Sequence, residues 1–224
     1  MNDIGYAIEA VLARIGRACE SAGRDPAGVT LIAVTKTVDA SRVDAAIKAG
    51  IRDVGENYIQ EAKGKIEMIG PGRARWHMIG HVQSNKVKYL PALFDCVHTV
   101  DRPEMLDKLE QYGKPMDVLF EVNIAGECSK SGTDTEGLEK VLERARSLNH
   151  LKPKGLMTMP PYTEDPEDAR PYFRKLRELL DEMNTKFGLG MKELSMGMSS
   201  DFEIAIQEGA TMVRVGTALF GARS

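Results

Sequence analysis

The sequence predicts an α/β fold, a single (β/α)8 barrel with an extra N-terminal helix. Eight short apolar runs with strand character alternate along the chain with amphipathic stretches of helical spacing. The length of 224 residues lies within the range that α/β barrels occupy as one unit. Because no Pro- or Gly-rich linker and no shift in composition divides the chain, one domain over residues 1–224 is expected.

The first expected element is a helix over residues 2–22, since Ile4, Ile8, Val11 and Ile15 recur at helical spacing. The eight expected strands cover residues 29–36, 53–57, 75–80, 96–100, 117–123, 154–159, 193–196 and 212–216. Helices are expected over residues 41–50, 58–69, 102–113, 135–148 and 168–188. Strands that are joined through helices run parallel, because a short hairpin cannot connect parallel neighbours. Eight such units close most economically as a barrel, and an open doubly wound sheet is the structural alternative.

The charge balance and the cysteine content restrict the setting and the partners. Thirty Lys and Arg face thirty-three Asp and Glu, a net charge of -3, so nucleic acid is not an expected partner. Cys19, Cys96 and Cys128 lack the spacing of a disulfide framework or a zinc site, which favours a reducing cytoplasm. The N-terminus lacks the basic start and apolar run of a signal peptide, and no apolar stretch is long enough to span a membrane. We therefore expect a cytoplasmic protein without a membrane partner.

Polar residues close most of the expected strands. In α/β barrels the reactive residues gather at the carboxyl ends of the strands, although strand ends that meet water are polar in any case. Lys36 closes the apolar run LIAVT, at the mouth of the predicted barrel. A partly desolvated ammonium loses proton affinity, and the neutral amine can attack an aldehyde to form an imine. The residues at or near these ends are Lys36, Asn57, His81, Asn123, Thr158, Ser199 and Arg214.

A candidate anion site follows the last two expected strands. Ser199 and Ser200 stand where a strand turns into a helix, and either of them or Asp201 could cap that helix. Free N–H groups at a helix start, together with two hydroxyls, suit a phosphate, although ordinary capping is the alternative. Gly216 and Thr217 end the eighth strand, where a glycine lets the backbone approach a phosphate closely. The loops after strands seven and eight are where barrels most often bind phosphate.

Arg214 is the candidate partner of a ligand ring. It alternates with Val213 and Val215, so its side chain points away from theirs and toward the barrel mouth beside Lys36. A guanidinium can only donate hydrogen bonds, so it would keep a facing ring nitrogen unprotonated; a structural pair with a carboxylate is the alternative. His77 lies on the expected strand 75–80 and His81 directly follows it, so four extended residues hold the two rings roughly 13 Å apart and they cannot share one ion. No metal site is therefore assigned.

Seven ordered blocks of sequence resemble one family over nearly the whole chain. They are AVTKT at 33–37, GENYIQE at 55–61, WHMIGHVQSNK at 76–86, SKSG at 129–132, KGLMTM at 154–159, SMGMSSD at 195–201 and VRVGTALFG at 213–221. Together they resemble the pyridoxal phosphate homeostasis protein family.

The resemblance implies an alanine-racemase-like barrel that holds pyridoxal 5′-phosphate (PLP) as a Schiff base on Lys36. Its pyridine nitrogen would face Arg214, and Asn57 would border the ring. Lys130 resembles a further family lysine that interacts with the cofactor or helps to pass it on. The phosphate would lie among Ser199, Ser200, Gly216 and Thr217.

The function that the resemblance implies is PLP (vitamin B6) and amino-acid homeostasis, as a carrier or reservoir and not as an enzyme. PLP-requiring apo-enzymes are the expected recipients, and a monomer is expected. An arginine at the pyridine nitrogen makes the ring a poorer electron sink, which disfavours transamination and decarboxylation.

The alternatives are an amino-acid racemase and a lysine-dependent aldolase for a sugar phosphate. A racemase needs a second acid/base, which in the resembling racemases is a tyrosine from an additional β domain of the partner subunit. This chain ends at Ser224, after the last expected strand and a short tail, so we do not expect that domain here. For the aldolase, no carboxylate and tyrosine set is evident beside Lys36.

Overall fold

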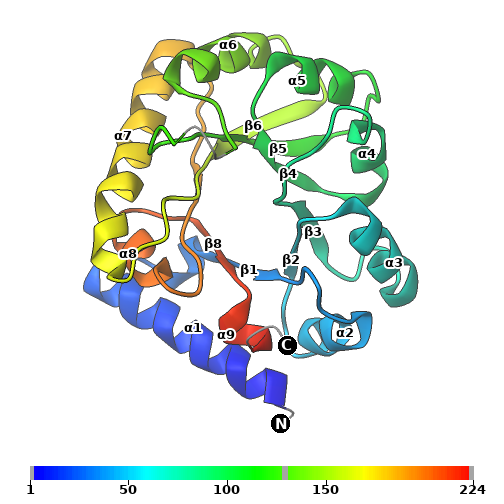
Figure 1. Ribbon diagram of the computed structural model, residues 1–224, viewed down its shortest axis with the longest axis vertical. Helices are drawn as coiled ribbons and strands as arrows, with labels where there is room; N and C mark the ends of the chain where they lie inside the picture. Colours follow the sequence, from blue (N-terminus) through cyan, green and yellow to red (C-terminus); the bar gives the residue numbers. More distant parts are fainter. Residues whose placement is uncertain (1–2, 128–130, 222–224) are drawn as a thin grey trace.

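Eight parallel strands close into a barrel in the order β1 to β8 (Figure 1). The computed structural model describes residues 3–127 and 131–221. All neighbouring strands pair in parallel, and β8 returns to β1. The predicted barrel is thus confirmed and the open sheet is excluded, whereas the single domain stays a prediction. The strands are β1 (Thr30–Val34), β2 (Asp53–Glu56), β3 (Arg75–Met78), β4 (Cys96–Val100), β5 (Met116–Glu121), β6 (Leu151–Met157), β7 (Glu193–Ser195) and β8 (Met212–Val215).

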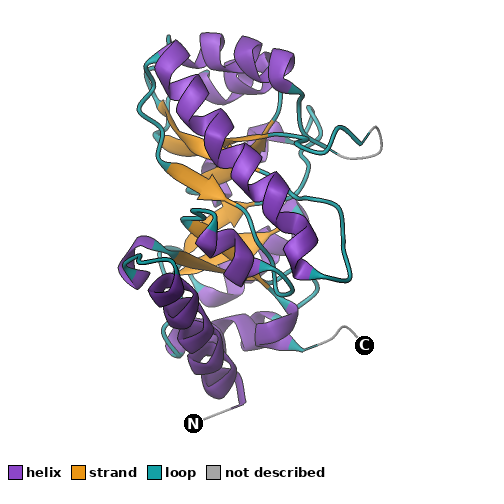
Figure 2. Cartoon of the chain, turned by 90° about the vertical axis from the view of Figure 1, so that its left-hand side faces the viewer, coloured by secondary structure: helices purple, strands orange, loops and turns teal. Residues whose placement is uncertain are grey.

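Helices surround the barrel, as Figures 1 and 2 show. The N-terminal helix α1 contacts α8 and α9, so the two ends of the described chain lie side by side. The predicted helices are all present, whereas the short α4 and α9 were not predicted. The helices are α1 (Asp3–Ser21), α2 (Ala40–Lys48), α3 (Ile59–Ile69), α4 (Leu90–Leu93), α5 (Pro103–Glu110), α6 (Thr135–Ala145), α7 (Arg170–Phe187), α8 (Phe202–Gln207) and α9 (Thr217–Phe220), with 3-10 turns at Pro26–Gly28, Val87–Tyr89 and Pro166–Ala169.

The alternation of side chains along each strand divides the core into two parts. Outward residues such as Val213 and Val215 join the large cluster that packs under the helices. A smaller apolar cluster fills the barrel interior, contributed by β1, β4, β5, β6 and β8. It consists of Ile32, Cys96, Leu119, Met157 and Met212. Arg214, which lies between the two valines, therefore points into the barrel, as the alternation predicts.

Strand β6 differs most from the sequence prediction. It covers Leu151–Met157, whereas residues 154–159 were expected. Pro153 interrupts the strand pattern, because proline cannot donate a hydrogen bond to a neighbouring strand. In the structure it pairs with Val118 next to a shift in register against β5, where the ladder is already irregular.

None of the described helices is both long and apolar enough to cross a membrane.

Candidate functional site

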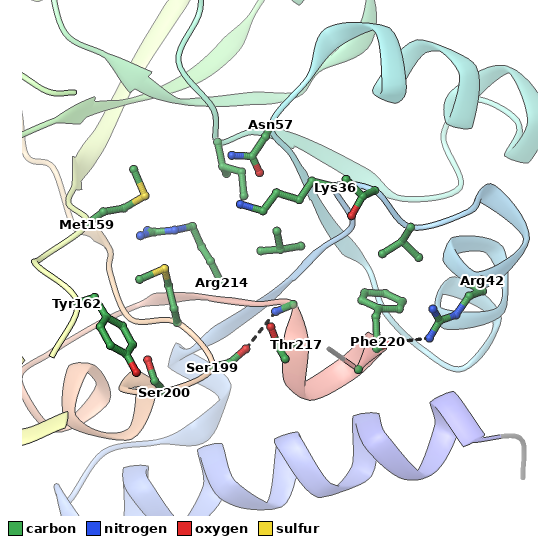
Figure 3. Close-up of a pocket in the computed structure, with 17 residues that line it drawn as sticks. Lys36, Arg42, Asn57, Met159, Tyr162, Ser199, Ser200, Arg214, Thr217 and Phe220 are labelled. Carbon is green, nitrogen blue, oxygen red and sulfur yellow. Dashed lines mark hydrogen bonds between the residues drawn. The ribbon is translucent and has the colours of Figure 1, made fainter. Parts of the chain in front are cut away.

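A cavity of about 610 Å³ opens at the carboxyl-terminal mouth of the barrel. Its volume lies within the range typical of small-molecule sites. Figure 3 shows the side chains of Lys36, Asn57 and Arg214 in its wall, with Ser199 and Thr217 at another part of the rim. The seven residues that were predicted to surround the cofactor all line this one cavity: Lys36, Asn57, Ser199, Ser200, Arg214, Gly216 and Thr217.

Lys36 lies on a tight turn after β1. The strand ends at Val34, two residues earlier than predicted, so the lysine is carried by the loop and not by the strand itself. Its side chain is half-buried. Thr37, the next residue, has a φ of 63°, which places a β-branched residue in the left-handed region. Such a conformation persists only where neighbouring residues enforce it, so contacts with other parts of the protein must stabilise the turn that presents Lys36.

A buried ion pair beneath this turn provides the restraint. Lys65 Nζ donates hydrogen bonds to the carbonyl of Thr35 and to Glu56 Oε1, both at 2.6 Å. Glu61 lies 3.3 Å from the same ammonium, and its Oε2 accepts a hydrogen bond of 2.8 Å from the amide of Thr37. Burial raises the pKa of Glu56, while hydrogen bonds from Lys65 and Thr35 oppose that rise. Thr35 and Thr37, the neighbours of Lys36, are thus held by hydrogen bonds to residues of β2 and α3.

The sequence did not single out these supporting residues. Glu61 and Lys65 are four residues apart on α3, which is the spacing of an ordinary solvated helix pair. What distinguishes Lys65 from the lysine of a solvated helix pair is that it is buried against Glu56 of β2. The two side chains are only 8% and 0% exposed. Arg42 and Tyr162 also line the cavity and were not predicted.

Arg214 is buried and held by neutral partners. One terminal nitrogen donates to Ser195 Oγ at 2.6 Å and the other donates to the carbonyl of Thr158 at 2.9 Å. Burial lowers the pKa of the guanidinium to about 10, while Glu121 and Asp201 oppose that shift. At neutral pH the group is therefore charged and can only donate hydrogen bonds.

The serine-rich turn after β7 faces backbone amides at the end of β8. Ser199 Oγ accepts hydrogen bonds from the amides of Gly216 at 3.3 Å and Ala218 at 3.4 Å. A Cβ atom on Gly216 would lie 3.3 Å from the carbonyl oxygen of Val34, so glycine suits the close packing of the end of β8 against β1. Of the three candidate caps, Asp201 occupies the N-cap position of α8, but its side chain makes no capping hydrogen bond, because its Oδ1 accepts instead from the amide of Met198 at 2.6 Å. Amides and hydroxyls thus converge at this end of the cavity, as a phosphate requires.

Asn57 contributes an oxygen that lacks a partner. It follows directly after β2, and its Oδ1 is buried without a hydrogen bond among the described residues. A buried acceptor in that state costs free energy unless a ligand satisfies it. Together with the amine of Lys36 and the donors at Ser199 and Gly216, this set fits a ligand with an aldehyde, a polar ring substituent and a phosphate.

Other predicted strand-end residues lie elsewhere. His81 is half-exposed and lies 4.0 Å from Asp101. Asn123 closes the loop after β5 by hydrogen bonds to the backbone of Glu127. Thr158 is buried and its hydroxyl donates to the carbonyl of Val122 at 2.8 Å. The residue at position 130, a lysine that the resemblance singled out, lies outside the described residues.

Known proteins are similar to this chain along nearly its whole length. It matches the family described as alanine racemase, N-terminal domain, over residues 8–224. The pyridoxal phosphate homeostasis protein of Aquifex aeolicus is 45% identical over 217 residues, which cover 95% of each chain. The protein of the same name from Pseudomonas aeruginosa is 46% identical over 227 residues, covering 100% of this chain and 97% of the relative.

A solved structure agrees with these relatives. PipY of Synechococcus elongatus, with PLP bound, superimposes with a TM-score of 0.82 and 33% sequence identity, covering 93% of this chain and 100% of PipY. The relatives match along essentially the whole chain, so the similarity includes every strand of the barrel. The chain therefore belongs to the pyridoxal phosphate homeostasis protein family, whose barrel is that of the alanine racemase N-terminal domain.

Proposed function

We propose that this chain binds PLP in the cavity at the barrel mouth and serves as a carrier or reservoir in PLP and amino-acid homeostasis. The observation that carries the proposal is the meeting of an amine, a buried arginine, an unsatisfied amide oxygen and a cluster of amides and hydroxyls in one cavity of about 610 Å³. The names of the relatives and the PLP bound to PipY support the same ligand.

Each part of the cavity has a role in this proposal. Lys36 holds the cofactor covalently through a Schiff base from its Nζ. Arg214 donates to the pyridine nitrogen and keeps it unprotonated, since its own pKa of about 10 leaves it charged at neutral pH. Asn57 borders the ring and offers its unsatisfied Oδ1. The phosphate lies among Ser199, Ser200, Gly216 and Thr217. When bound, PLP supplies an aldehyde that links reversibly to amines.

PLP uptake by the purified protein tests the binding. PLP is titrated into cofactor-free wild type, Lys36→Ala and the control Lys63→Ala, whose lysine is 62% exposed on α3. We expect a visible absorbance of a bound Schiff base in wild type and in the control, and its loss in Lys36→Ala. Equal spectra for wild type and Lys36→Ala would contradict the role of Lys36, and a wild type that binds no PLP would contradict the function.

Delivery to other proteins is a separate part of the proposal. PLP-requiring apo-enzymes are the proposed recipients, and the chain is proposed to act as a cytoplasmic monomer. The loaded protein is mixed with a cofactor-free PLP enzyme, and the recovery of that enzyme's activity is compared with the dissociation rate of PLP from the loaded protein. Recovery faster than dissociation supports directed delivery, whereas recovery no faster than dissociation contradicts it.

Racemase activity is the second candidate, and one observation favours it. Tyr162 lines the same cavity and offers a second proton-transfer group in addition to Lys36. Its side chain is 85% exposed, and no hydrogen bond fixes its hydroxyl within the part of the chain that the structure describes. A catalytic acid needs a defined position, so the carrier is the proposal that we favour. Incubation of the loaded protein with L-alanine distinguishes the two, because steady formation of D-alanine that Tyr162→Phe abolishes would establish the racemase.

A further inference from the structure

A line of polar side chains crosses the interior of the barrel and ends at Arg214. It begins at Asp53, the first residue of β2, at the mouth opposite to the cavity. Asp53 Oδ1 lies 2.9 Å from His77 Nε2, and His77 Nδ1 lies 2.9 Å from His98 Nε2. His98 Nδ1 lies 2.9 Å from Ser195 Oγ, which accepts the hydrogen bond from Arg214. We call Asp53, His77, His98 and Ser195 the histidine chain.

The hydrogen bonds of the histidine chain can all run in one direction. Arg214 can only donate, and a carboxylate at Asp53 can only accept, so the Nε2 of His77 carries a proton. The Nδ1 of a neutral His77 then accepts from His98 Nε2–H, and the Nδ1 of His98 accepts the hydroxyl proton of Ser195. Every link is satisfied with both rings neutral. Burial, with His77 and Arg214 nearby, holds the pKa of His98 well below its ordinary value, which agrees with a neutral ring.

A metal ion is the competing use of these residues. The ligand atoms of His77, Cys96 and His98 lie within 4.8 Å of one another, a grouping invisible in the sequence, where only His77 and His81 were compared. The ring nitrogens of both histidines are already engaged in the hydrogen bonds given above. Burial also raises the pKa of the Cys96 thiol, which disfavours the thiolate that a metal requires. The geometry therefore favours a hydrogen-bonded chain over a metal site.

We propose that the residues of the histidine chain are positioning residues that orient Arg214 for PLP. Through the polarised hydrogen bonds between them, the negative charge of Asp53 also stabilises the positive charge of the guanidinium. Ser195 fixes one terminal nitrogen of Arg214, while the carbonyl of Thr158 fixes the other. The two ends carry opposite charges, and the neutral links between them polarise one another. The positioning of PLP rests on the proposed function, whereas the protonation pattern of the two histidines can be measured without any cofactor.

The Asp53→Asn substitution tests the chain from its far end. A carboxamide can accept from His77 or donate to it, so the chain gains a second, reversed direction, in which both rings carry their proton on Nδ1. Asp117→Asn is the matched control, because Asp117 is a carboxylate at the same mouth that pairs with Arg75 and Lys154 and is not among the hydrogen-bond partners of the two histidines. Both variants remove one negative charge, so a difference between them reports the chain and not the local field.

The measurement is nitrogen-15 NMR of the histidine rings in cofactor-free protein, followed by PLP titration of the same samples. The protein has four histidines. His81 and His150 are both partly exposed and lie outside the histidine chain, so the variants His81→Gln and His150→Gln identify their signals. We expect Nε2–H on both His77 and His98 in wild type and in the control. We expect mixed protonation at both rings in Asp53→Asn, with PLP affinity lowered about fivefold.

Several results would overturn the proposal. An Nδ1–H on either buried ring of wild type, or a stoichiometric metal ion in the purified protein, would contradict the hydrogen-bond pattern of the histidine chain. A change at His77 without one at His98 in Asp53→Asn would show that the links are not coupled. A changed protonation of both rings in Asp53→Asn with an unchanged PLP affinity would contradict the positioning role. A wild type with the expected rings that binds no PLP would instead overturn the proposed function and leave the chain intact.

Discussion

Glu121 should make the stability of the protein fall as the pH rises from about 4.5 toward neutrality. It is the last residue of β5, is 2% exposed, and has one carboxyl oxygen, Oε2, without a partner among the described residues. Burial, followed by the nearby Asp101, raises its pKa from the ordinary 4.5 to about 7, while Arg214 opposes the shift. The folded protein therefore retains a proton on this carboxyl that the unfolded chain loses at much lower pH.

The sign and the size of the effect follow from linkage. Between pH 4.5 and 7 the folded state binds more protons at Glu121 than the unfolded state, so the free energy of unfolding decreases as the pH rises. The slope is about 1.4 kcal/mol per pH unit, and the total loss across this window is about 3 kcal/mol. Glu121→Gln has a similar shape and no proton to lose, so it should remove this contribution.

Urea unfolding of cofactor-free protein at a series of pH values, from about 5 to about 8, measures the effect. The control is Glu136→Gln, whose side chain is 78% exposed on α6. We expect the stability of wild type and the control to decline by about 3 kcal/mol more than that of Glu121→Gln over this range. Parallel pH profiles for wild type and Glu121→Gln would refute the reasoning.

Two further predictions concern the packing around the site. Lys65→Met leaves Glu56 buried without its partner and should lower the free energy of unfolding by about 3–5 kcal/mol; a loss below about 1 kcal/mol in urea unfolding would contradict the importance of the pair. Gly155→Ala places a methyl group 1.7 Å from the carbonyl oxygen of Glu193 and should cost about 1–3 kcal/mol as β6 and β7 separate. Gly28→Ala, where an added methyl group meets nothing within 4 Å, is its control, and equal thermal unfolding of the two variants would be inconsistent with this packing.

The barrel could be predicted because its strands and helices alternate strongly in the sequence. Lys36 and Arg214 were found for the same reason, since a barrel brings the carboxyl ends of β1 and β8 together. The exact strand ends were not predictable from apolar runs: Thr35 is buried but already belongs to the turn that carries Lys36. Pro153 concealed the start of β6, because its strand tolerates proline only at a shift in register.

The histidine chain could not be predicted from the sequence. His77 and His98 are 21 residues apart, and His98 and Ser195 are 97 residues apart, so only the closed barrel brings them into contact. The buried pair of Lys65 and Glu56 was missed for a related reason. Its spacing along α3 and β2 is that of ordinary surface charges, and burial becomes visible only when the helix packs on the sheet.

The covalent attachment of PLP to Lys36 is the central claim, and chemical fixation tests it most directly. The protein is saturated with PLP, reduced with borohydride, digested and analysed by peptide mass spectrometry, with Lys36→Ala treated in parallel. We predict one reduced PLP adduct on the peptide that contains Lys36, and no stoichiometric adduct in the variant. A stoichiometric adduct on another lysine, or wild-type protein that binds PLP but yields no adduct, would contradict the account.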